Sequence, residues 1–145
     1  MQLTILSISG KPGLYKLVAR GKANLIVEAI DSSHKRMPTF ATDRVVSLAD
    51  ITMYGADDDV PLMKILCDMR DKEGAAPASL NFRKASPAEL HEYLSAILPG
   101  YDRDRVHDSD IRRLIQWYNI LVENGITNFE EAMKPTEGDN IADRL

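Results

Sequence analysis

The chain has 145 residues, of which 44% are hydrophobic and 28% charged, and its net charge is −4. These proportions exclude a disordered chain and a fibrous repeat, and the length fits one ordinary domain or two very small ones. The single cysteine, Cys67, excludes an internal disulfide and a cysteine-rich zinc site, and it fits a reducing compartment. Because the first segment shows neither a basic leader nor a long apolar run, we expect a cytoplasmic protein.

The charge is unevenly distributed along the chain. Residues 1–54 contain seven Lys/Arg against four Asp/Glu, a balance of +3. Residues 55–145 contain eleven Lys/Arg against eighteen Asp/Glu, a balance of −7. This asymmetry suggests two parts with different surfaces.

Residues 1–56 are predicted to form a small β module, because β-branched and aromatic residues occur there in short runs separated by turn residues. One short helical turn is expected within 43–50. Five short strands and this turn predict a small, curled, SH3-like β-barrel. The expected strands are Leu3–Ser9, Leu14–Arg20, Asn24–Ile30, Arg36–Thr42 and Ile51–Tyr54.

The second and third strands are predicted to form a hairpin with a three-residue loop, 21–23, and a bulge at Gly21. This register brings opposite charges and apolar residues together across the strands. It pairs Tyr15 with Ala29, Lys16 with Glu28, Leu17 with Val27, and Val18 with Ile26.

The two faces of this hairpin receive different roles. Tyr15, Leu17, Ala19, Leu25, Val27 and Ala29 share the face that we expect inside. Val18, Ile26 and Ile30 leave too much apolar surface on the other face to stay in water, so we expect them against the helices or a partner.

Residues 57–134 are predicted to form a helical module of three to four helices, because the apolar period changes from two to about 3.6. One helix opens near Asp59 and ends at Gly74. A second follows the capping box Ser86–Glu89. A third starts at Asp108 as its cap and closes at Gly125, and a last short turn follows at 128–131. Residues 73–85 indicate a linker or loop, and 135–145 a frayed tail.

The Gly10-Lys11 pair raises the possibility of a nucleotide-binding loop. Such a loop needs a glycine five residues earlier, Ser or Thr after the lysine, and a helix next. None of these is present, since Pro12 follows the lysine and the next segment alternates like a strand. The stretch 11–14 fits a type II turn, with the positive φ at Gly13.

A cluster of carboxylates at residues 102–110, with His107 among them, suggests a metal site, and hence a metal-assisted hydrolase. Neither Asp102 nor Asp108 starts a calcium loop, because the third ligand position falls on Val106 or Arg112. The alternative is that Asp108 and Asp110 favour the N-terminus of the third helix while Asp/Arg pairs are solvated. We therefore predict no metal site, no catalytic residues and no cofactor.

The basic surface of the first half is the candidate for nucleic-acid binding. Small barrels often bind nucleic acid through phosphate contacts and stacking on aromatic residues. Aromatic residues are scarce here, and an excess of +3 is weak, so a solvated surface is the alternative. The candidate residues are Lys11, Lys16, Arg20, Lys22, Lys35, Arg36 and Arg44.

Three stretches of the chain are distinctive as a set. They are LSISGKPGLYKL at the start, SLADITMY followed by acidic residues and VPL, and LPGYDRDRVHDSDIRRLIQWYNIL later. Over about residues 1–131 the chain resembles a family of short uncharacterised Bacteroidetes proteins, known as a domain of unknown function. The resemblance implies a β module followed by a helical module, and it transfers no catalytic residue.

These observations favour a non-enzymatic protein-interaction or adaptor module, with self-association as part of it. The helical half has strong caps and apolar stripes but no convergent polar groups typical of a small-molecule pocket. Trp117 flanks the core face of its helix and is expected at the junction with the β module or at a partner. Weak binding of RNA or single-stranded DNA to the basic face is the alternative function, and no membrane partner is expected.

Overall fold

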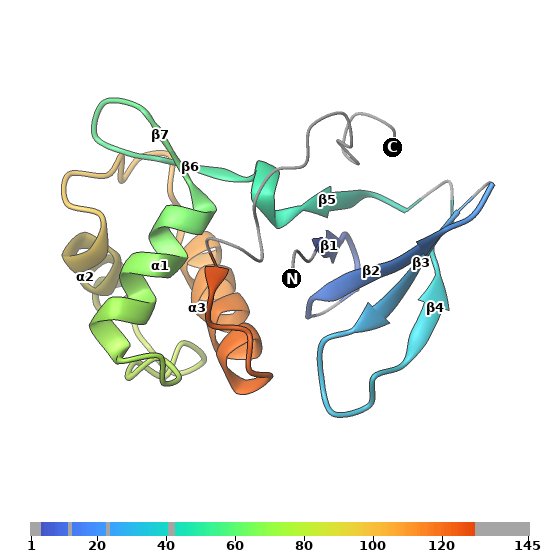
Figure 1. The fold of residues 1–145 in the computed structure, drawn as a ribbon. Helices are drawn as coiled ribbons and strands as arrows, with labels where there is room; N and C mark the ends of the chain where they lie inside the picture. The colour runs from blue at the N-terminus through green and yellow to red at the C-terminus, as the bar shows by residue number, and fades with distance from the viewer. Residues whose placement is uncertain (1–3, 12, 23, 41–42, 130–145) are drawn as a thin grey trace.

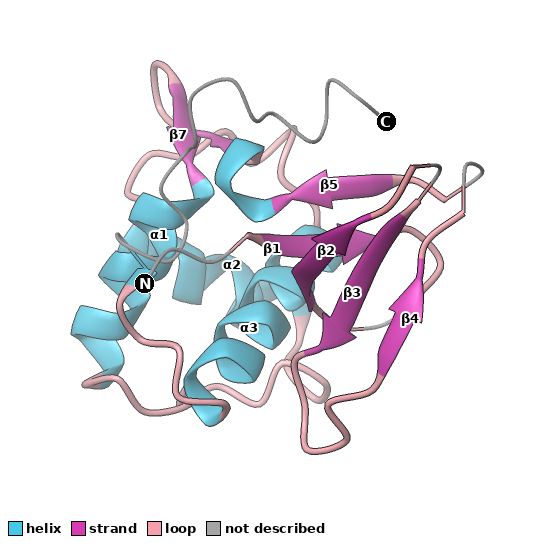
Figure 2. Cartoon of the chain, turned by 45° about the vertical axis from the view of Figure 1, so that its right-hand side comes forward, coloured by secondary structure: helices cyan, strands magenta, loops and turns pink. Residues whose placement is uncertain are grey.

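The computed structural model describes residues 4–11, 13–22, 24–40 and 43–129. In this part the chain is α+β, with the five-stranded sheet on one side, the helices on the other, and α3 next to the sheet (Figure 1, Figure 2). The elements are β1 (Ile5–Ile8), β2 (Tyr15–Arg20), β3 (Leu25–Ala29), β4 (Arg36–Pro38), β5 (Val45–Ser47), the 3-10 turn η1 (Leu48–Asp50), β6 (Thr52–Tyr54), β7 (Asp59–Pro61), α1 (Leu62–Glu73), α2 (Pro87–Ile97) and α3 (Asp108–Glu123).

The SH3-like barrel prediction is wrong. The first five strands form an antiparallel sheet in the order β4-β3-β2-β1-β5, and β6 pairs with β7 in a separate hairpin. No pairing joins the edge strands β4 and β5 within the described residues, so the sheet stays open. The segment predicted as the fifth barrel strand, Ile51–Tyr54, pairs with β7 and is not available to join β4 and β5.

The predicted hairpin register is correct from Tyr15 to Leu17 and fails at the next position. In the structure Ala19, not Val18, lies opposite Ile26, because the bulge falls between Leu17 and Ala19 and not at Gly21. The extra residue turns Val18 outward, where 38% of it is exposed. The bulge therefore removes Val18 from the interdomain contact that the sequence predicted for it.

Two strands were missed by the sequence analysis. Residues 45–47 form β5, and the helical turn expected within 43–50 is confined to η1. Residues 59–61 form β7, so α1 starts at Leu62 instead of near Asp59. In both places a three-residue strand is too short to show an alternation that sequence patterns can detect.

The sheet and the helices share one apolar core. Buried side chains of the three helices pack with Ile5 from β1, Leu14 and Ile30 from the ends of β2 and β3, and Leu48 from η1. Of the residues predicted to face the helices, Ile30 lies in this core and Ile26 is half-buried outside it. The opposite face of the sheet has its own small core of Leu6, Ile8, Tyr15, Val27, Ala29 and Val45, with Leu17, Leu25 and Met37 packed against it.

Apart from the later start of α1, the helix ends agree with the sequence except at the cap of α3. Gly74 takes the left-handed conformation after α1, and Ser86 and Glu89 form the predicted capping box. Residue 107, not Asp108, caps α3: the backbone N–H of His107 donates to the Asp110 carboxylate at 3.0 Å.

The segment 73–85 is held by specific contacts and is not a bare linker. The backbone N–H of Ala78 donates to Asn119 Oδ1 at 2.8 Å, and the Tyr118 hydroxyl donates to the Ala76 carbonyl at 2.8 Å. Arg112 donates to the carbonyls of Phe82 and Ala85. The predicted tail, 135–145, and residues 130–131 of the last turn lie outside the described residues. None of the helices in the described part of the chain combines the length and apolarity needed to span a membrane.

Candidate anion-binding cleft

A cleft lies between the β1–β5 edge of the sheet and α3. It consists of two adjoining hollows of about 500 Å³ and 240 Å³, which share Ile51, Arg113 and Trp117. The larger hollow extends over β1, the β1–β2 turn and the start of β5, and the smaller one over β6 and the segment before α3. The larger hollow falls within the usual volume of ligand sites.

The strand pattern explains why this end of the junction is hollow. Ile5 packs into the core beside the helices, and alternation brings Ser7 and Ser9 to the same face of β1. Ser7 lies opposite Val46, and the Ser9 N–H donates to the Arg44 carbonyl at 2.9 Å. The helix-facing side of the sheet therefore changes from apolar to polar along β1, and tight packing ends there.

The facing side of α3 is also polar. Arg113, Gln116 and Trp117 have i, i+3 and i+4 spacing, so they share one helix face, and all three line the larger hollow. Trp117 is almost fully buried in the common core. It stands at the junction between the sheet and the helices, the place that the sequence analysis gave it.

The larger hollow is lined by three cations and, among the described residues, by no carboxylate. The cations come from three separate elements: Lys11 from the β1–β2 turn, Arg44 from the residue before β5, and Arg113 from α3. Arg113 has a long ion pair with Asp110 at 3.7 Å. No ion pair engages Arg44 within the described part of the chain, so its charge is uncompensated. Lys11 Nζ instead donates to Met37 Sδ at 3.7 Å, and Met37 packs against the core on the opposite face of the sheet, so the Lys11 ammonium is turned away from the hollow.

The smaller hollow is lined by a cation and an exposed aromatic ring that lie next to each other. The Arg105 guanidinium lies 5.3 Å from the centre of the Tyr54 ring, and Tyr54 is 45% exposed. Asp110 is the acid on this side of the cleft. The smaller hollow thus offers a flat, accessible surface beside the charged one.

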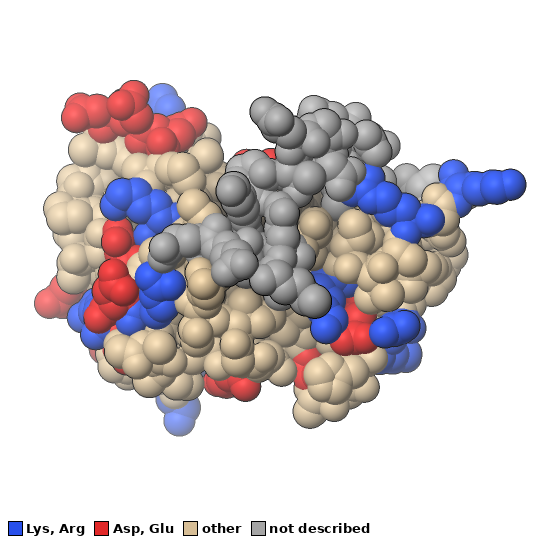
Figure 3. Space-filling model, in the orientation of Figure 1, with Lys and Arg blue, Asp and Glu red and all other residues tan. Residues whose placement is uncertain are grey.

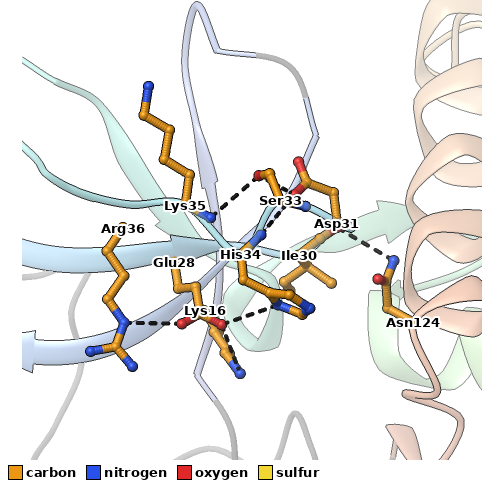
Figure 4. A network of polar contacts seen from close by, with 9 residues as sticks. All are labelled: Lys16, Glu28, Ile30, Asp31, Ser33, His34, Lys35, Arg36 and Asn124. Carbon is orange, nitrogen blue, oxygen red and sulfur yellow. Dashed lines mark hydrogen bonds and ion pairs between the residues drawn. The ribbon is translucent and has the colours of Figure 1, made fainter.

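The helix-facing side of the sheet, which carries Ile5, extends along β2 to β4 away from the helices (Figure 1). This outlying part, called the outer face below, carries other predicted cations, and there a carboxylate engages them (Figure 4). Glu28 Oε2 lies 3.2 Å from Lys16 Nζ and 3.5 Å from His34 Nδ1, and Glu28 Oε1 accepts from Arg36 Nε at 3.0 Å. The Glu28 side chain is only 9% exposed. The hydrogen bond from Arg36, and then that from Lys16, lowers the pKa of Glu28.

The other predicted basic residues are exposed and scattered. Arg20 ends β2, Lys22 lies in the β2–β3 loop, and Lys35 precedes β4. Acidic side chains instead gather over the β6–β7 loop, at the far side of the molecule from this sheet (Figure 3). The sequence-predicted basic surface is thus divided into a group that Glu28 engages, a scattered set, and Arg44, which lines the cleft together with Arg113 from the acidic half.

A polar cluster around His91 was missed by the sequence analysis. The ring of His91 forms hydrogen bonds to the Tyr101 hydroxyl and, at 2.8 Å through Nε2, to the Asp108 carboxylate. Burial raises the pKa of Tyr101. These bonds tie α2 to the segment before α3, and no spacing rule links residues 91, 101 and 108. Asp108 therefore holds His91 and does not cap its helix.

The carboxylates of 102–110 do not converge. Asp102 lies 3.5 Å from Arg105, and Asp110 faces Arg113 and the N-terminus of α3. In the described residues, no three His, Cys, Asp or Glu side chains gather as they would around a metal ion.

Comparisons with known proteins cover nearly all of the described chain. The family model of DUF5606, a domain of unknown function, matches residues 3–48, and that of DUF6852, also a domain of unknown function, matches 51–121. A solution NMR structure of a structural-genomics target from Bacteroides vulgatus is 57% identical, with a TM-score of 0.74. That similarity covers 90% of this chain and 93% of the other chain. No curated protein matches.

Proposed function

The chain belongs to the Bacteroidetes family defined by DUF5606 and DUF6852, and from this premise we propose that it is a protein-interaction module. The proposed ligand is an extended, anionic segment of a partner protein. The segment binds in the cleft between the sheet edge and α3. The single observation that carries the proposal is the cation set of the larger hollow, which no carboxylate balances within the described lining.

The position of β5 supports an extended ligand. β5 is an edge strand of the sheet, and Val46 at its centre lines the hollow. An edge strand offers backbone N–H and C=O groups to an added strand, and neighbouring pockets then select its side chains. A segment alongside β5 would bring its acidic side chains to Arg44 and Arg113.

The chemistry of the lining supports binding and not catalysis. Its hydroxyl groups, those of Ser7, Ser9 and Thr52, have no histidine beside them among the described lining residues, so no activated nucleophile is formed. Cys67 and His91 lie elsewhere, the first half-buried on α1 and the second bound to Tyr101 and Asp108. We accordingly propose a non-enzymatic, cytoplasmic adaptor.

The test is an NMR titration of the full chain with octapeptide pools rich in Asp and Glu, and with lysine-rich pools of the same length. We expect shifts of amides in 7–11, 44–47 and 113–117 with the acidic pools alone, and these shifts should fade with salt. An unmoved spectrum with acidic pools at low salt would show that the proposal is wrong.

Nucleic acid is the competing occupant. Phe40 is 62% exposed and Tyr54 45%, so both can stack on bases. Against this, Glu28 engages Lys16 and Arg36, which weakens the attraction of the outer face for phosphates. Short RNA and DNA oligomers form the second arm of the titration. Stronger shifts with oligomers than with acidic peptides, centred on β2 to β4, would replace the proposal by nucleic-acid binding.

A further inference from the structure

We infer that the larger hollow is a site for a phosphate group carried on the partner segment, which makes the ligand a phosphorylated peptide. This inference rests on the proposed function, since it specifies the anionic group that the cleft recognises. It concerns the end of the cleft that Arg44 and Arg113 line.

The number and origin of the cations favour a phosphate over a carboxylate. A carboxylate carries one charge and is satisfied by a single guanidinium in a bidentate pair. A phosphorylated side chain carries about −1.5 to −2 charges at pH 7 and three strong acceptor oxygens. Two guanidinium groups from two different elements, Arg44 and Arg113, match the phosphate in charge and supply several donors for its oxygens.

The rest of the lining offers hydrogen-bond donors without competing acids. The hydroxyl groups of Ser7 and Ser9 and the side-chain amide of Gln116 line the same hollow. Gly10 and Gly13, at φ +84° and +82°, line it as bare backbone, and a Cβ at either position would meet nothing within 4 Å. Because Gly10 and Gly13 have no side chain and open space beside them, an anion can approach their backbone closely.

The size and position of the hollow indicate a phosphate on a peptide. About 500 Å³ exceeds the space that a phosphate group needs, so the hollow holds the group together with the residue that carries it. The edge strand β5 continues directly from Arg44 and lines the same hollow through Val46. An added strand along β5 would therefore deliver a phosphorylated side chain to the cations.

The experiment compares three fluorescent octapeptide pools that have randomised flanks and a fixed central residue: phosphothreonine, Glu or Thr. Binding to the full chain is followed by anisotropy. We expect the phosphothreonine pool to bind at least tenfold more tightly than the Glu pool. The double variant Arg44→Gln/Arg113→Gln should lose at least tenfold for that pool, whereas Lys16→Gln/Arg36→Gln, its matched control on the outer face, should lose less than twofold. A cooperative melting transition well above the assay temperature confirms that each variant is folded.

The outcomes separate the inference from the proposed function. Equal binding of the phosphothreonine and Glu pools would overturn the phosphate site and leave the acidic-segment function intact. Absence of binding by either pool would overturn both. A third arm uses inorganic phosphate and ATP: if either binds as tightly as the phosphothreonine pool, the phosphate comes from a small molecule and the peptide ligand is wrong.

Discussion

The outer face of the sheet and the cleft carry the same kinds of residue but differ in what surrounds them. On the outer face, Lys16 and Arg36 lie within hydrogen-bond distance of the Glu28 carboxylate. In the cleft, Arg44 has no carboxylate partner in the described chain, and Arg113 has only a long one. One region therefore uses its cations internally, whereas the cleft leaves two guanidinium groups for the ligand that we propose.

This difference shows that the number of basic residues in a segment does not measure the charge available for binding. A single acidic residue, Glu28, accounts for two of the seven candidate cations and contacts His34 as well. The cleft gains a cation from Arg113, which belongs to the half of the chain with a balance of −7. Local pairing and tertiary placement, and not net charge, distinguish the two regions.

The largest effect is expected when the cleft cations are removed together. The variant Lys11→Gln/Arg44→Gln/Arg113→Gln should lower the affinity for the preferred anionic peptide by roughly 100-fold or more, because each hydrogen bond to a charged group contributes about 1.5–3 kcal/mol. Anisotropy titration measures this affinity. Lys16→Gln/Arg36→Gln is the comparison variant, and an equal loss in both would mean that the two regions do not differ in function.

Much of the fold could be predicted from the sequence where local rules act over several residues. The Ser86–Glu89 capping box and the glycine after α1 are local signals, and both appear in the structure. The barrel prediction failed because it took Ile51–Tyr54 as the fifth strand, whereas this segment pairs with β7. The fifth strand of the sheet is β5, whose residues were interpreted as part of a helical turn. The bulge at Val18 also escaped prediction, since a register argument compares whole strands and cannot place one extra residue.

The candidate site could be predicted only in part. Lys11 and Arg44 were among the basic candidates, and Trp117 was expected at a junction. Arg113 was not identified, because nothing within α3 indicates which face meets the sheet edge. The pairing of Lys16 with Glu28 was predicted from the register, but its consequence for binding depends on the burial of the carboxylate, which only the structure shows.

Two substitutions, one at a buried site and one at an exposed site, should differ in their effect on the free energy of unfolding. Leu14 is fully buried at the junction between the sheet and the helices. Leu14→Ala should lower the free energy of unfolding by about 2–5 kcal/mol, whereas Val18→Ala, at an exposed site, should change it by less than about 1 kcal/mol. Denaturant titration measures both. Equal costs would restore Val18 to the interdomain contact that the sequence predicted.

Removing the outer carboxylate should make the outer face resemble the cleft. Glu28→Gln releases Lys16 and Arg36, so binding of a short single-stranded oligonucleotide at low salt should strengthen by a few-fold. Glu92→Gln, an exposed position on α2, changes the net charge equally and serves as the control. Anisotropy at two salt concentrations gives the affinity and its salt dependence. The same gain in both variants would attribute the effect to net charge alone.

The smallest effect concerns the pH dependence of stability, and it tests whether Glu28 is engaged in solution. Hydrogen bonds from Arg36 and Lys16 lower the pKa of Glu28 in the folded protein. A lowered pKa means that the unfolded chain binds the proton more readily. The stabilisation is therefore fully present above the pKa of Glu28 in the unfolded chain, about 4.3–4.5. It is lost as the pH falls through the pKa of Glu28 in the folded protein.

The measurement is the melting temperature of wild type and Glu28→Gln between pH 7 and pH 3. Asp31, Glu73 and Glu89 also have lowered pKa values and are present in both proteins, so the difference between the two curves isolates Glu28. We expect this difference to be constant from pH 7 to about pH 5 and to shrink below that. Repeating the pair in a His34→Asn background removes the imidazole that also faces Glu28. A difference that persists unchanged to pH 3 would mean that the carboxylate is not held by Lys16 and Arg36, and the contrast between the outer face and the cleft would then be lost.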